Sequence, residues 1–282
     1  MVKKLTDFPW KKVLETAEID LISWERVSPL IKHEVFKELN LQPKNYIPIY
    51  SEQERQRKLG TTQNIWPFRT GKGECVLIRG NMSVKNTYQS PNTKLILLEE
   101  TCIPKSCSLG NSKTEREYLA QGFNSRVFHQ LLINESKKEV FLGSAGKLYL
   151  NAKVQYHSVP IKLKNVQFEL DWTVETRNEV LHFEAKYSPK KPTPEYILFQ
   201  VFYPTVYLSE KVKNKTIRPF FLDIIKGHGF VDYHFMEIGY DDTLNLSSYK
   251  VVPIQNTTIR VSLSDQRFPN LMSYINTNRT RK

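Results

Sequence analysis

The chain has 282 residues, of which 40% are hydrophobic and 25% are charged. These fractions are normal for a soluble globular protein, and no run approaches the roughly eighteen apolar residues of a membrane span. The length fits one large domain or two small ones. The net charge is +12, from 41 lysines and arginines against 29 acidic residues. We expect an anionic partner, nucleic acid first and an anionic membrane surface second, although a generally basic proteome would give the same charge.

Cysteine usage indicates a reducing compartment. Cys75, Cys102 and Cys107 are few and odd in number, and residues 1–4 do not begin a secretory signal. We therefore expect a cytoplasmic protein. Cys102 and Cys107 enclose four residues, with no second pair and no nearby histidine, so a zinc site is not expected there.

The first forty residues carry a helical pattern. Trp10, Val13 and Leu14 fall at helical spacing and Ser28-Pro29 is typical of a helix start, so residues 5–40 are predicted to be helical. Two short helices in a basic N-terminus are compatible with a helix-turn-helix that reads a major groove, but such pairs more often serve packing or a dimer contact. We expect residues 1–60 to be a helical N-terminal segment and residues 61–282 to be the main domain.

The following segments are predicted from local pattern. Residues 40–75 are predicted to be a basic loop, in which Arg69 or Lys72 is as suited to solvation as to phosphate contact. Residues 114–134 carry an apolar stripe typical of a helix, with Glu115 and Glu117 in its first turn. Apolar or alternating runs predict strands at 74–78, 95–98, 149–163, 217–225, 231–238 and 246–254.

Residues 166–186 are predicted to form a β-hairpin. Apolar and polar residues alternate on both sides of a polar turn at 175–178, so each strand has one apolar and one polar face. The hairpin would place Glu169 opposite Glu184, with Asp171 one step away on the diagonal. Facing like charges destabilise a ladder, and three carboxylates beside Lys186 suit a divalent cation. The plainer alternative is a solvated polar face.

Asp171 and Glu184-Ala185-Lys186, separated by twelve residues, resemble the PD-(D/E)xK signature of the restriction-endonuclease-like nucleases. In that superfamily the aspartate lies on one strand of a hairpin and the (D/E)xK on the next. Leu170 stands where the signature has proline, a residue that is often absent in the family. A second acid-x-lysine at 135–137 has no predicted strand around it and is set aside.

The resemblance extends over roughly residues 60 to 270. The stretches Trp66–Glu74 and Pro194–Pro204 resemble parts of bacterial restriction-like nucleases. The second stretch is predicted to be a helix that carries Gln200, with Thr193 as its cap and its end at Pro204. The family implies an α/β fold: a restriction-endonuclease-like core with a central mixed β-sheet flanked by helices, preceded here by the small helical segment.

The resemblance implies a Mg²⁺-dependent endonuclease that hydrolyses DNA, most simply a type II enzyme of a restriction-modification system. One or two Mg²⁺ ions would be bound by Asp171, Glu184 and the carbonyl of Ala185, and Lys186 would orient or deprotonate the attacking water. Glu169 would assist from beside the metal ligands. The predicted catalytic residues are Asp171, Glu184, Lys186, Glu169 and Gln200, of which Gln200 is nearly as well explained by packing.

In some relatives a glutamate of the helix before the hairpin joins the metal ligands. The resemblance therefore points to Glu117 as a further candidate, although helix capping or solvation is the plainer role for this residue.

The implied partners are double-stranded DNA and a second copy of the chain, since two identical sites related by a two-fold axis cut a symmetric sequence. From Lys186 to Arg218 there are seven lysines and arginines and two glutamates, which predicts salt-dependent DNA binding beside the site. Two alternatives stay open. One is a nuclease of the same chemistry for repair, junctions or RNA, and the other is a non-catalytic basic nucleic-acid-binding protein.

Overall fold

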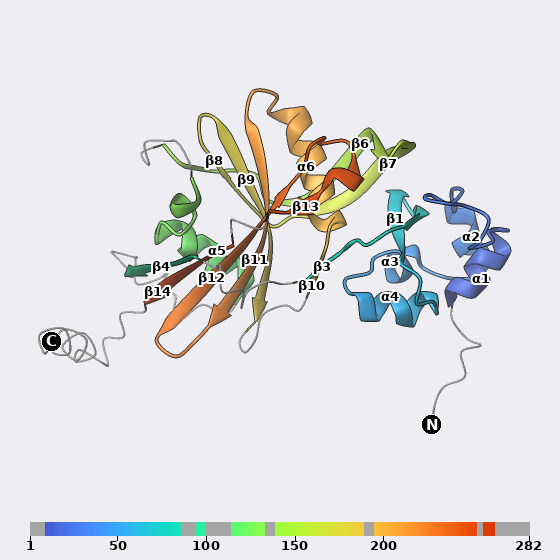
Figure 1. Ribbon diagram of the computed structural model, residues 1–282, viewed down its shortest axis with the longest axis horizontal. Coiled ribbons are helices and arrows are strands. Elements are labelled where there is room, and N and C mark those ends of the chain that lie inside the picture. The colour runs from blue at the N-terminus through green and yellow to red at the C-terminus, as the bar shows by residue number, and fades with distance from the viewer. Residues whose placement is uncertain are drawn as a thin grey trace, which may run out of the picture.

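The computed structural model describes residues 9–85, 94–99, 114–132, 139–188, 195–252 and 256–262. It has a mixed α/β fold in which a curled central sheet is flanked by helices (Figure 1). The strand order is β4-β14-β12-β11-β9-β8-β5, with β13 beside β12; the pairs β9–β11 and β14–β4 are parallel. The strands are β4 (Lys94–Glu99), β5 (Phe141–Leu142), β8 (Trp172–Glu175), β9 (Glu179–Ser188), β11 (Thr216–Lys226), β12 (Phe230–Gly239), β13 (Lys250–Val251) and β14 (Thr257–Ser262).

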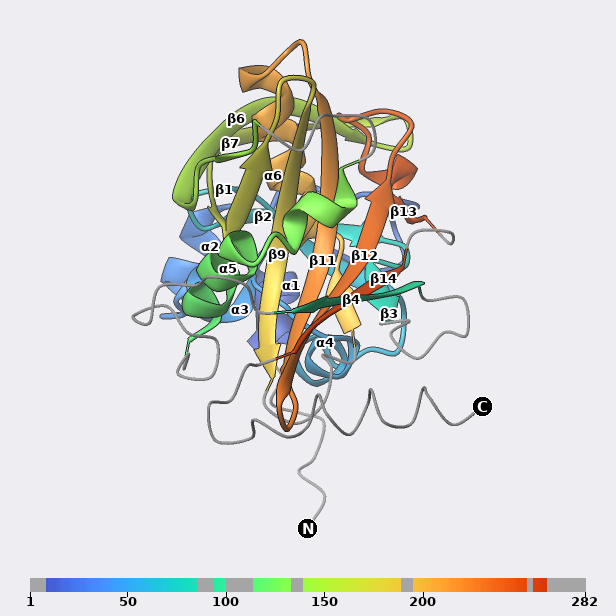
Figure 2. The same cartoon turned by 90° about the vertical axis from the view of Figure 1, so that its left-hand side faces the viewer.

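Helices cover both faces of this sheet (Figure 2). On one face lie α5 (Glu115–Asn124) and the 3₁₀ helix η4 (Phe128–Leu131), which share an apolar cluster with Phe183, Phe220 and Tyr233. On the other face lies α6 (Phe199–Lys211), where Thr205 Oγ1 is 2.7 Å from His182 Nε2. Both faces of β9 are therefore buried from Glu179 to Ala185, and the prediction of a solvated polar face is wrong for this strand.

The N-terminal half is built around the hairpin of β1 (Ile65–Gly71) and β2 (Glu74–Arg79). Four short helices surround it: α1 (Pro9–Thr16), α2 (His33–Glu38), α3 (Pro43–Tyr46) and α4 (Glu52–Leu59). The strand at 74–78 is confirmed. The prediction of a loop over 40–75 is wrong, because α3, α4 and β1 lie within it.

Within residues 9–40, the described part of the predicted helical range, helix forms only at α1 and α2. Ser28 does not begin a helix; its N–H donates to the carbonyl of Leu77 at 2.9 Å, and its Oγ accepts from the Leu77 N–H at 2.8 Å. Val27 and Ile31 also bridge to β2, so the segment between the two helices is held as an extra strand-like strap. With residues 17–32 between the helices, a helix-turn-helix does not form.

One hydrophobic cluster joins the two halves of the chain. Trp10, Phe36 and Ile47 from the N-terminal segment pack in the same cluster as Phe68 and Phe202. A domain boundary at residue 60 stays a prediction, but the described residues on its two sides share this cluster.

A long ribbon of β6 (Gly146–Tyr156) and β7 (Val159–Leu170) lies beside α6. The strand pattern predicted over 149–163 is confirmed, but it is divided between two strands, because His157, with a φ of +54°, turns the chain between them. The predicted hairpin is confirmed only next to its turn, where Trp172 is opposite Phe183; the prediction is wrong for residues 166–170. The strand β7 pairs with β6, where Glu169 is opposite Lys147 and not Glu184, and only the short β8 pairs with β9.

Two further predictions are corrected around α6 and the last strands. Residues 195–197 form β10 (Glu195–Ile197), paired with β3 (Ser83–Lys85), and α6 then runs through Pro204 to Lys211. Pro204 is tolerated inside the helix because the residues around it are buried, and their packing offsets the lost N–H bond. In the predicted strand over 246–254, the structure has a 3₁₀ helix, η5 (Leu246–Ser248), followed by the two-residue β13.

The strands predicted at 95–98, 217–225 and 231–238 are confirmed as β4, β11 and β12. The helix predicted over 114–134 is divided, because Arg126 has a φ of +59° between α5 and η4. Thr193, Cys102, Cys107 and the acid-x-lysine at 135–137 lie outside the described residues.

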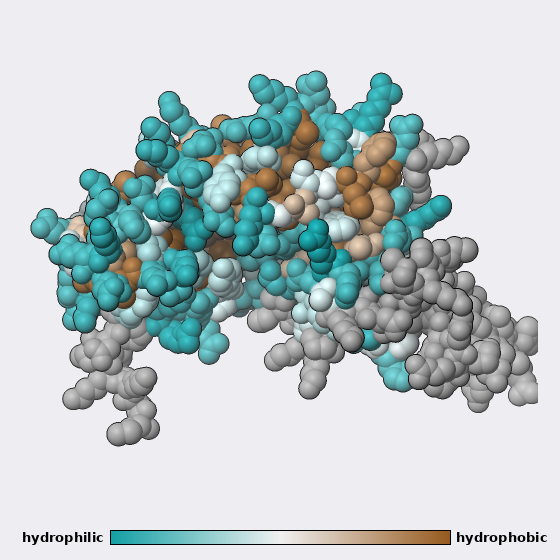
Figure 3. Space-filling view, turned by 180° about the vertical axis from the view of Figure 1, so that it is seen from behind, coloured by the Kyte–Doolittle hydropathy of each residue, from teal (hydrophilic) through white to brown (hydrophobic). Residues whose placement is uncertain are grey.

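The surface seen from behind is dominated by hydrophilic side chains, with hydrophobic patches between them (Figure 3). None of the helices in the described part of the chain is long and apolar enough to cross a membrane.

Candidate active site

The candidate site lies where β9 extends beyond the end of its neighbouring strand β8. The pairing of β8 with β9 ends at Trp172 and Phe183, so the next outward-facing amides of β9 have no strand partner on that side. Instead, the N–H of Ala185 donates to Asp171 Oδ2 at 2.9 Å, and the N–H of Tyr187 donates to Glu115 Oε2 at 3.2 Å. Asp171 reaches β9 from the junction of β7 and β8, where the chain leaves the ribbon and enters the sheet.

Glu184 is the centre of the hydrogen bonds at this site. It is buried, and its Oε1 accepts from Lys186 Nζ at 2.7 Å and from Gln200 Nε2 at 2.6 Å. The amide of Gln200 is itself fixed, because its Oε1 accepts from the N–H of Ile197 at 3.0 Å. The structure thus brings together Asp171, Glu184, Lys186 and Gln200, although only β8 and β9 form the predicted hairpin and residues 166–170 pair with β6 instead.

The electrostatics of the cluster are unbalanced. Burial raises the pKa of Glu184 to about 8, with a further contribution from the nearby charge of Asp171. Burial also raises the pKa of Asp171, against the opposing effect of the Lys186 ammonium. For Lys186, burial lowers the pKa, but Glu184 and the other carboxylates raise it overall. One lysine does not neutralise this group, which therefore favours binding a proton or a cation.

The cluster opens into a cleft of about 560 Å³. Asp171, Glu184, Lys186 and Gln200 line it, and the side chain of Lys186 is 40% exposed. Glu169 and Lys147 line the cleft as well, so Glu169 belongs to the same surface although it does not face Glu184 across a ladder. The opposite walls come from residues 47–50 and from Pro67 and Arg69 of β1, which places the N-terminal segment directly at the site.

The donor set suits Mg²⁺. Among the described residues, no three His, Cys, Asp or Glu side chains converge as a complete metal site. Magnesium, however, is usually held by one or two carboxylates, with waters and substrate phosphate as the other ligands. Asp171 and Glu184 supply that number, and a divalent cation would offset the cost of holding these buried carboxyl groups charged, the cost that raises their pKa values.

Glu115 is the carboxylate that sequence reasoning missed. The structure makes Glu117 a capping residue: its Oε2 accepts from the Thr114 N–H at 3.0 Å, while Thr114 caps the N–H of Glu117. Glu115 instead points to β9, and its pKa is raised by burial and, less strongly, by Asp171 against the lowering effect of Lys186. The capping-box spacing of Thr114 and Glu117 is visible in the sequence and could have directed attention to Glu115.

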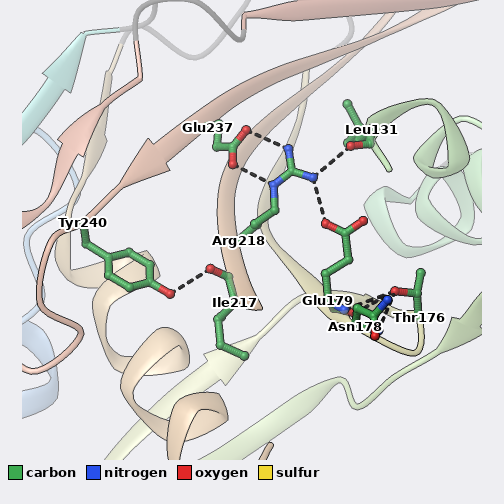
Figure 4. A network of polar contacts seen from close by, with 8 residues as sticks. All are labelled: Leu131, Thr176, Asn178, Glu179, Ile217, Arg218, Glu237 and Tyr240. Carbon is green, nitrogen blue, oxygen red and sulfur yellow. Dashed lines mark hydrogen bonds and ion pairs between the residues drawn. The ribbon is translucent and has the colours of Figure 1, made fainter. Parts of the chain in front are cut away.

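The basic run from Lys186 to Arg218 ends in the protein interior (Figure 4). Arg218 is buried, and its Nε and Nη2 donate to the two oxygens of Glu237, each at 2.8 Å. Its Nη1 donates to Glu179 Oε2 at 3.0 Å and to the carbonyl of Leu131 at 2.9 Å. Lys215 similarly binds Glu175 and the carbonyl of Thr176. These two cations stabilise the fold and are not available to a ligand.

Fold and site together describe a mixed α/β protein that has a carboxylate–lysine cluster at the rim of a cleft. The chain belongs to the family described as a domain of unknown function, DUF6997, which matches residues 82–256. No curated protein and no solved structure matches the chain. The cluster and Glu115 lie inside the matched residues, whereas the cleft walls at 47–50 and on β1 precede them.

Proposed function

We propose that the protein is a metal-dependent nuclease of the PD-(D/E)xK type that hydrolyses phosphodiester bonds in DNA. The observation that carries the proposal is the meeting of Asp171 and Glu184, both with raised pKa values, beside Lys186 in an open cleft. Strongly perturbed carboxyl groups in a cleft are typical of functional sites. A restriction-endonuclease-like topology belongs to the proposal, supported by an aspartate that precedes the central strand and a helix after it that carries Gln200.

The chain's own residues divide the work as follows. Asp171 and Glu184 hold Mg²⁺, which supplies Lewis acidity and an activated water when bound. Lys186 is kept protonated by its carboxylate neighbours, so it stabilises negative charge developing on the phosphate; of the two roles that the resemblance implies, this charge favours stabilisation over deprotonation of water. Gln200 fixes the Glu184 carboxylate through a 2.6 Å hydrogen bond.

The test is cleavage of supercoiled plasmid and of linear DNA with Mg²⁺, against the same reactions in EDTA. Asp171→Asn and Lys186→Ala should each lower the cleavage rate on the order of a hundredfold or more, as for loss of an electrostatic stabiliser. Asp171→Asn should also lose Mg²⁺ binding, whereas Lys186→Ala should keep it. Both variants should still bind DNA, because phosphate contacts elsewhere supply affinity.

A matched control exists outside the cleft. Asp241 and Lys250 form an exposed ion pair at 3.3 Å, and neither lines the cleft. The double variant Asp241→Asn, Lys250→Ala removes the same chemical groups and should cut DNA like the wild type. Wild-type-like cleavage by Asp171→Asn, or no cleavage of any DNA or RNA by the wild type with Mg²⁺ or Mn²⁺, would refute the assignment.

A narrower form of the proposal is a type II restriction endonuclease acting as a homodimer on double-stranded DNA. Digestion of one DNA of known sequence should then give a fixed set of fragments. Light scattering should show a dimer, alone or on cognate DNA. Cleavage without a fixed pattern would leave the nuclease chemistry and favour a repair- or structure-directed enzyme.

A further inference from the structure

Two more hollows continue the catalytic cleft along the surface. The second, of about 420 Å³, shares Ile47, Arg69 and Gln167 with the cleft. The third, of about 450 Å³, shares Lys44, Lys72 and their neighbours Pro43 and Gly73 with the second. The three hollows are therefore contiguous and lead from Glu184, past the tip of the β1–β2 hairpin, to α2. We call this continuous surface the track.

The outer part of the track is positively charged. Lys44 and Lys72 line both outer hollows, Arg69 lines the second, and Lys37 and His33 line the third. Among the described residues, neither outer hollow has an aspartate or glutamate in its lining. The three lysines are exposed, and none of them forms an ion pair with a described carboxylate. This charge is uncompensated, unlike that of Arg218.

The backbone fixes these lysines next to one another. Lys72 stands at the tip of the β1–β2 hairpin between Gly71 and Gly73. Gly73 has a φ of +79°, and any Cβ at this position would collide with the ring of His33. Because a glycine is present, the start of α2 packs directly on the hairpin tip, which sets Lys37 and Lys72 around one hollow.

Exposed aromatic rings accompany the cations. Tyr149 is 55% exposed and lines the second hollow, while Tyr50 is 61% exposed and lines the cleft. Phosphates attract lysines, but only unpaired bases present their faces to such rings. Cations that follow a backbone, together with aromatic rings on which bases stack, are the usual means of binding single-stranded nucleic acid.

We propose that the track binds a single-stranded stretch of nucleic acid and leads it to the catalytic carboxylates. Its phosphates contact Lys37, Lys44, Lys72 and Arg69, and its bases stack on Tyr149 and Tyr50. The role of the track in catalysis rests on the proposed nuclease function, whereas strand binding itself can be measured without cleavage.

The binding test uses fluorescence anisotropy of a labelled oligothymidylate, and of a duplex of the same length, in EDTA. The triple variant Lys37→Ala, Lys44→Ala, Lys72→Ala should bind the single strand at least tenfold more weakly. Its plot of log K against log salt should be shallower by about 2, at roughly 0.7 per lost phosphate contact. The control removes Lys12, Lys153 and Lys162, which are exposed and line none of the three hollows, and should bind almost like the wild type.

The proposed stacking of a base on Tyr149 is tested with a separate pair of variants. Tyr149→Ala should weaken single-strand binding by about 5- to 150-fold, which corresponds to the roughly 1–3 kcal/mol of one base–aromatic contact. Tyr149→Phe keeps the ring and should bind close to the wild type. Equal binding by Tyr149→Ala and the wild type would overturn the stacking assignment.

Different experimental results would refute the nuclease proposal and the track proposal. A small diester, bis(p-nitrophenyl) phosphate, contacts only the carboxylate end, so the triple lysine variant should hydrolyse it at the wild-type rate. If the wild type hydrolyses neither this diester nor DNA, yet the lysines are needed for oligonucleotide binding, the nuclease proposal fails and the track stands. The track is overturned if the triple variant binds as tightly as the wild type, or if the duplex binds tenfold better than the single strand. It is also overturned if these lysines serve only binding to phosphatidylserine vesicles.

Discussion

Glu179 and Glu184 lie on the same strand and both are buried, but they differ in the positive groups that neutralise them. At Glu179, the guanidinium of Arg218 makes four hydrogen bonds to two carboxylates and a carbonyl, all from the protein. At Glu184, a half-exposed lysine faces three carboxylates at the rim of a cleft. The protein itself neutralises the charges around Glu179. The negative charge around Glu184 exceeds that of its lysine, so a proton or a cation in the cleft must balance it.

This difference separates an ion network that the protein completes by itself from one that suits a bound cation. A buried pair that is completed by the protein is costly to break, because one partner is left charged and desolvated. A buried carboxylate pair without enough positive charge shifts its pKa and binds protons or metal instead. The comparison predicts that substitutions near Glu179 mainly lower stability, whereas substitutions near Glu184 mainly lower activity.

The largest effect on stability is expected from Arg218→Met. It leaves Glu179 and Glu237 buried without their cation and should lower the free energy of unfolding by about 3–5 kcal/mol. Lys186→Met should change stability far less, since the carboxyl groups around it can take up protons. Urea denaturation of the two variants measures the contrast. Equal losses of stability would show that the two ends of β9 do not differ in this way.

The next effect concerns pH in the absence of metal. The pKa of Glu184 is raised from 4.5 to about 8, so the native state holds a proton that the unfolded chain releases in this range. Stability should therefore fall as the pH rises from about 4.5 to 8. Glu184→Gln should reduce this slope and be more stable than the wild type at pH 8. Thermal unfolding at both ends of the range tests this, with Asp241→Asn as the control that keeps the wild-type slope.

Addition of Mg²⁺ should stabilise the protein through the same carboxylates. A ligand that binds only the native state at a hundred times its Kd contributes about 2.7 kcal/mol. The midpoint of thermal unfolding should rise by several degrees in the wild type and stay unchanged in Asp171→Asn. If neither Mg²⁺ nor Mn²⁺ changes the unfolding midpoint of the wild type, the charge of these carboxylates is balanced by something other than a divalent cation.

The smallest effects are expected for the two glutamates at the start of α5. Glu117→Ala removes half of a capping box and should cost about 0.3–1.5 kcal/mol of stability, with cleavage unchanged. Glu115→Gln should leave stability nearly unchanged and lower the cleavage rate several-fold, because it alters the charge around Lys186. Loss of cleavage in Glu117→Ala, with full activity in Glu115→Gln, would reverse these roles.

The sequence could predict the chemistry of the site better than its geometry. Alternation along a strand places Glu184 and Lys186 on one face, and this is a local property. The point at which the chain changes partners is harder to predict. Residues 166–175 alternate without interruption, so the pattern does not mark Asp171 as the place where pairing with β6 ends and pairing with β9 begins. Each pairing is made across its own short turn, and the change between them carries Glu169 away from Glu184.

The walls of the cleft could not be predicted for a similar reason. Residues 47–50 have no motif, and they reach the site only because α1, α2 and the strap at Val27–Ile31 pack on β1 and β2. Helix α6 continues through Pro204 because tertiary packing outweighs local propensity. The capping role of Glu117, in contrast, depends on local spacing, and the structure confirms it.

The position of the cleft wall has a consequence for how such a protein can evolve. The family match begins at residue 82, so the carboxylate–lysine cluster lies within the matched residues, whereas the wall at 47–50 and the lysines of the track precede them. Under the proposed function, the residues of the chemistry and the lysines of the track are encoded in separate parts of the chain, while Tyr149 of the track lies in the matched part. Substitutions before residue 82 can then alter the lysines and the cleft wall without changing Asp171, Glu184 or Lys186.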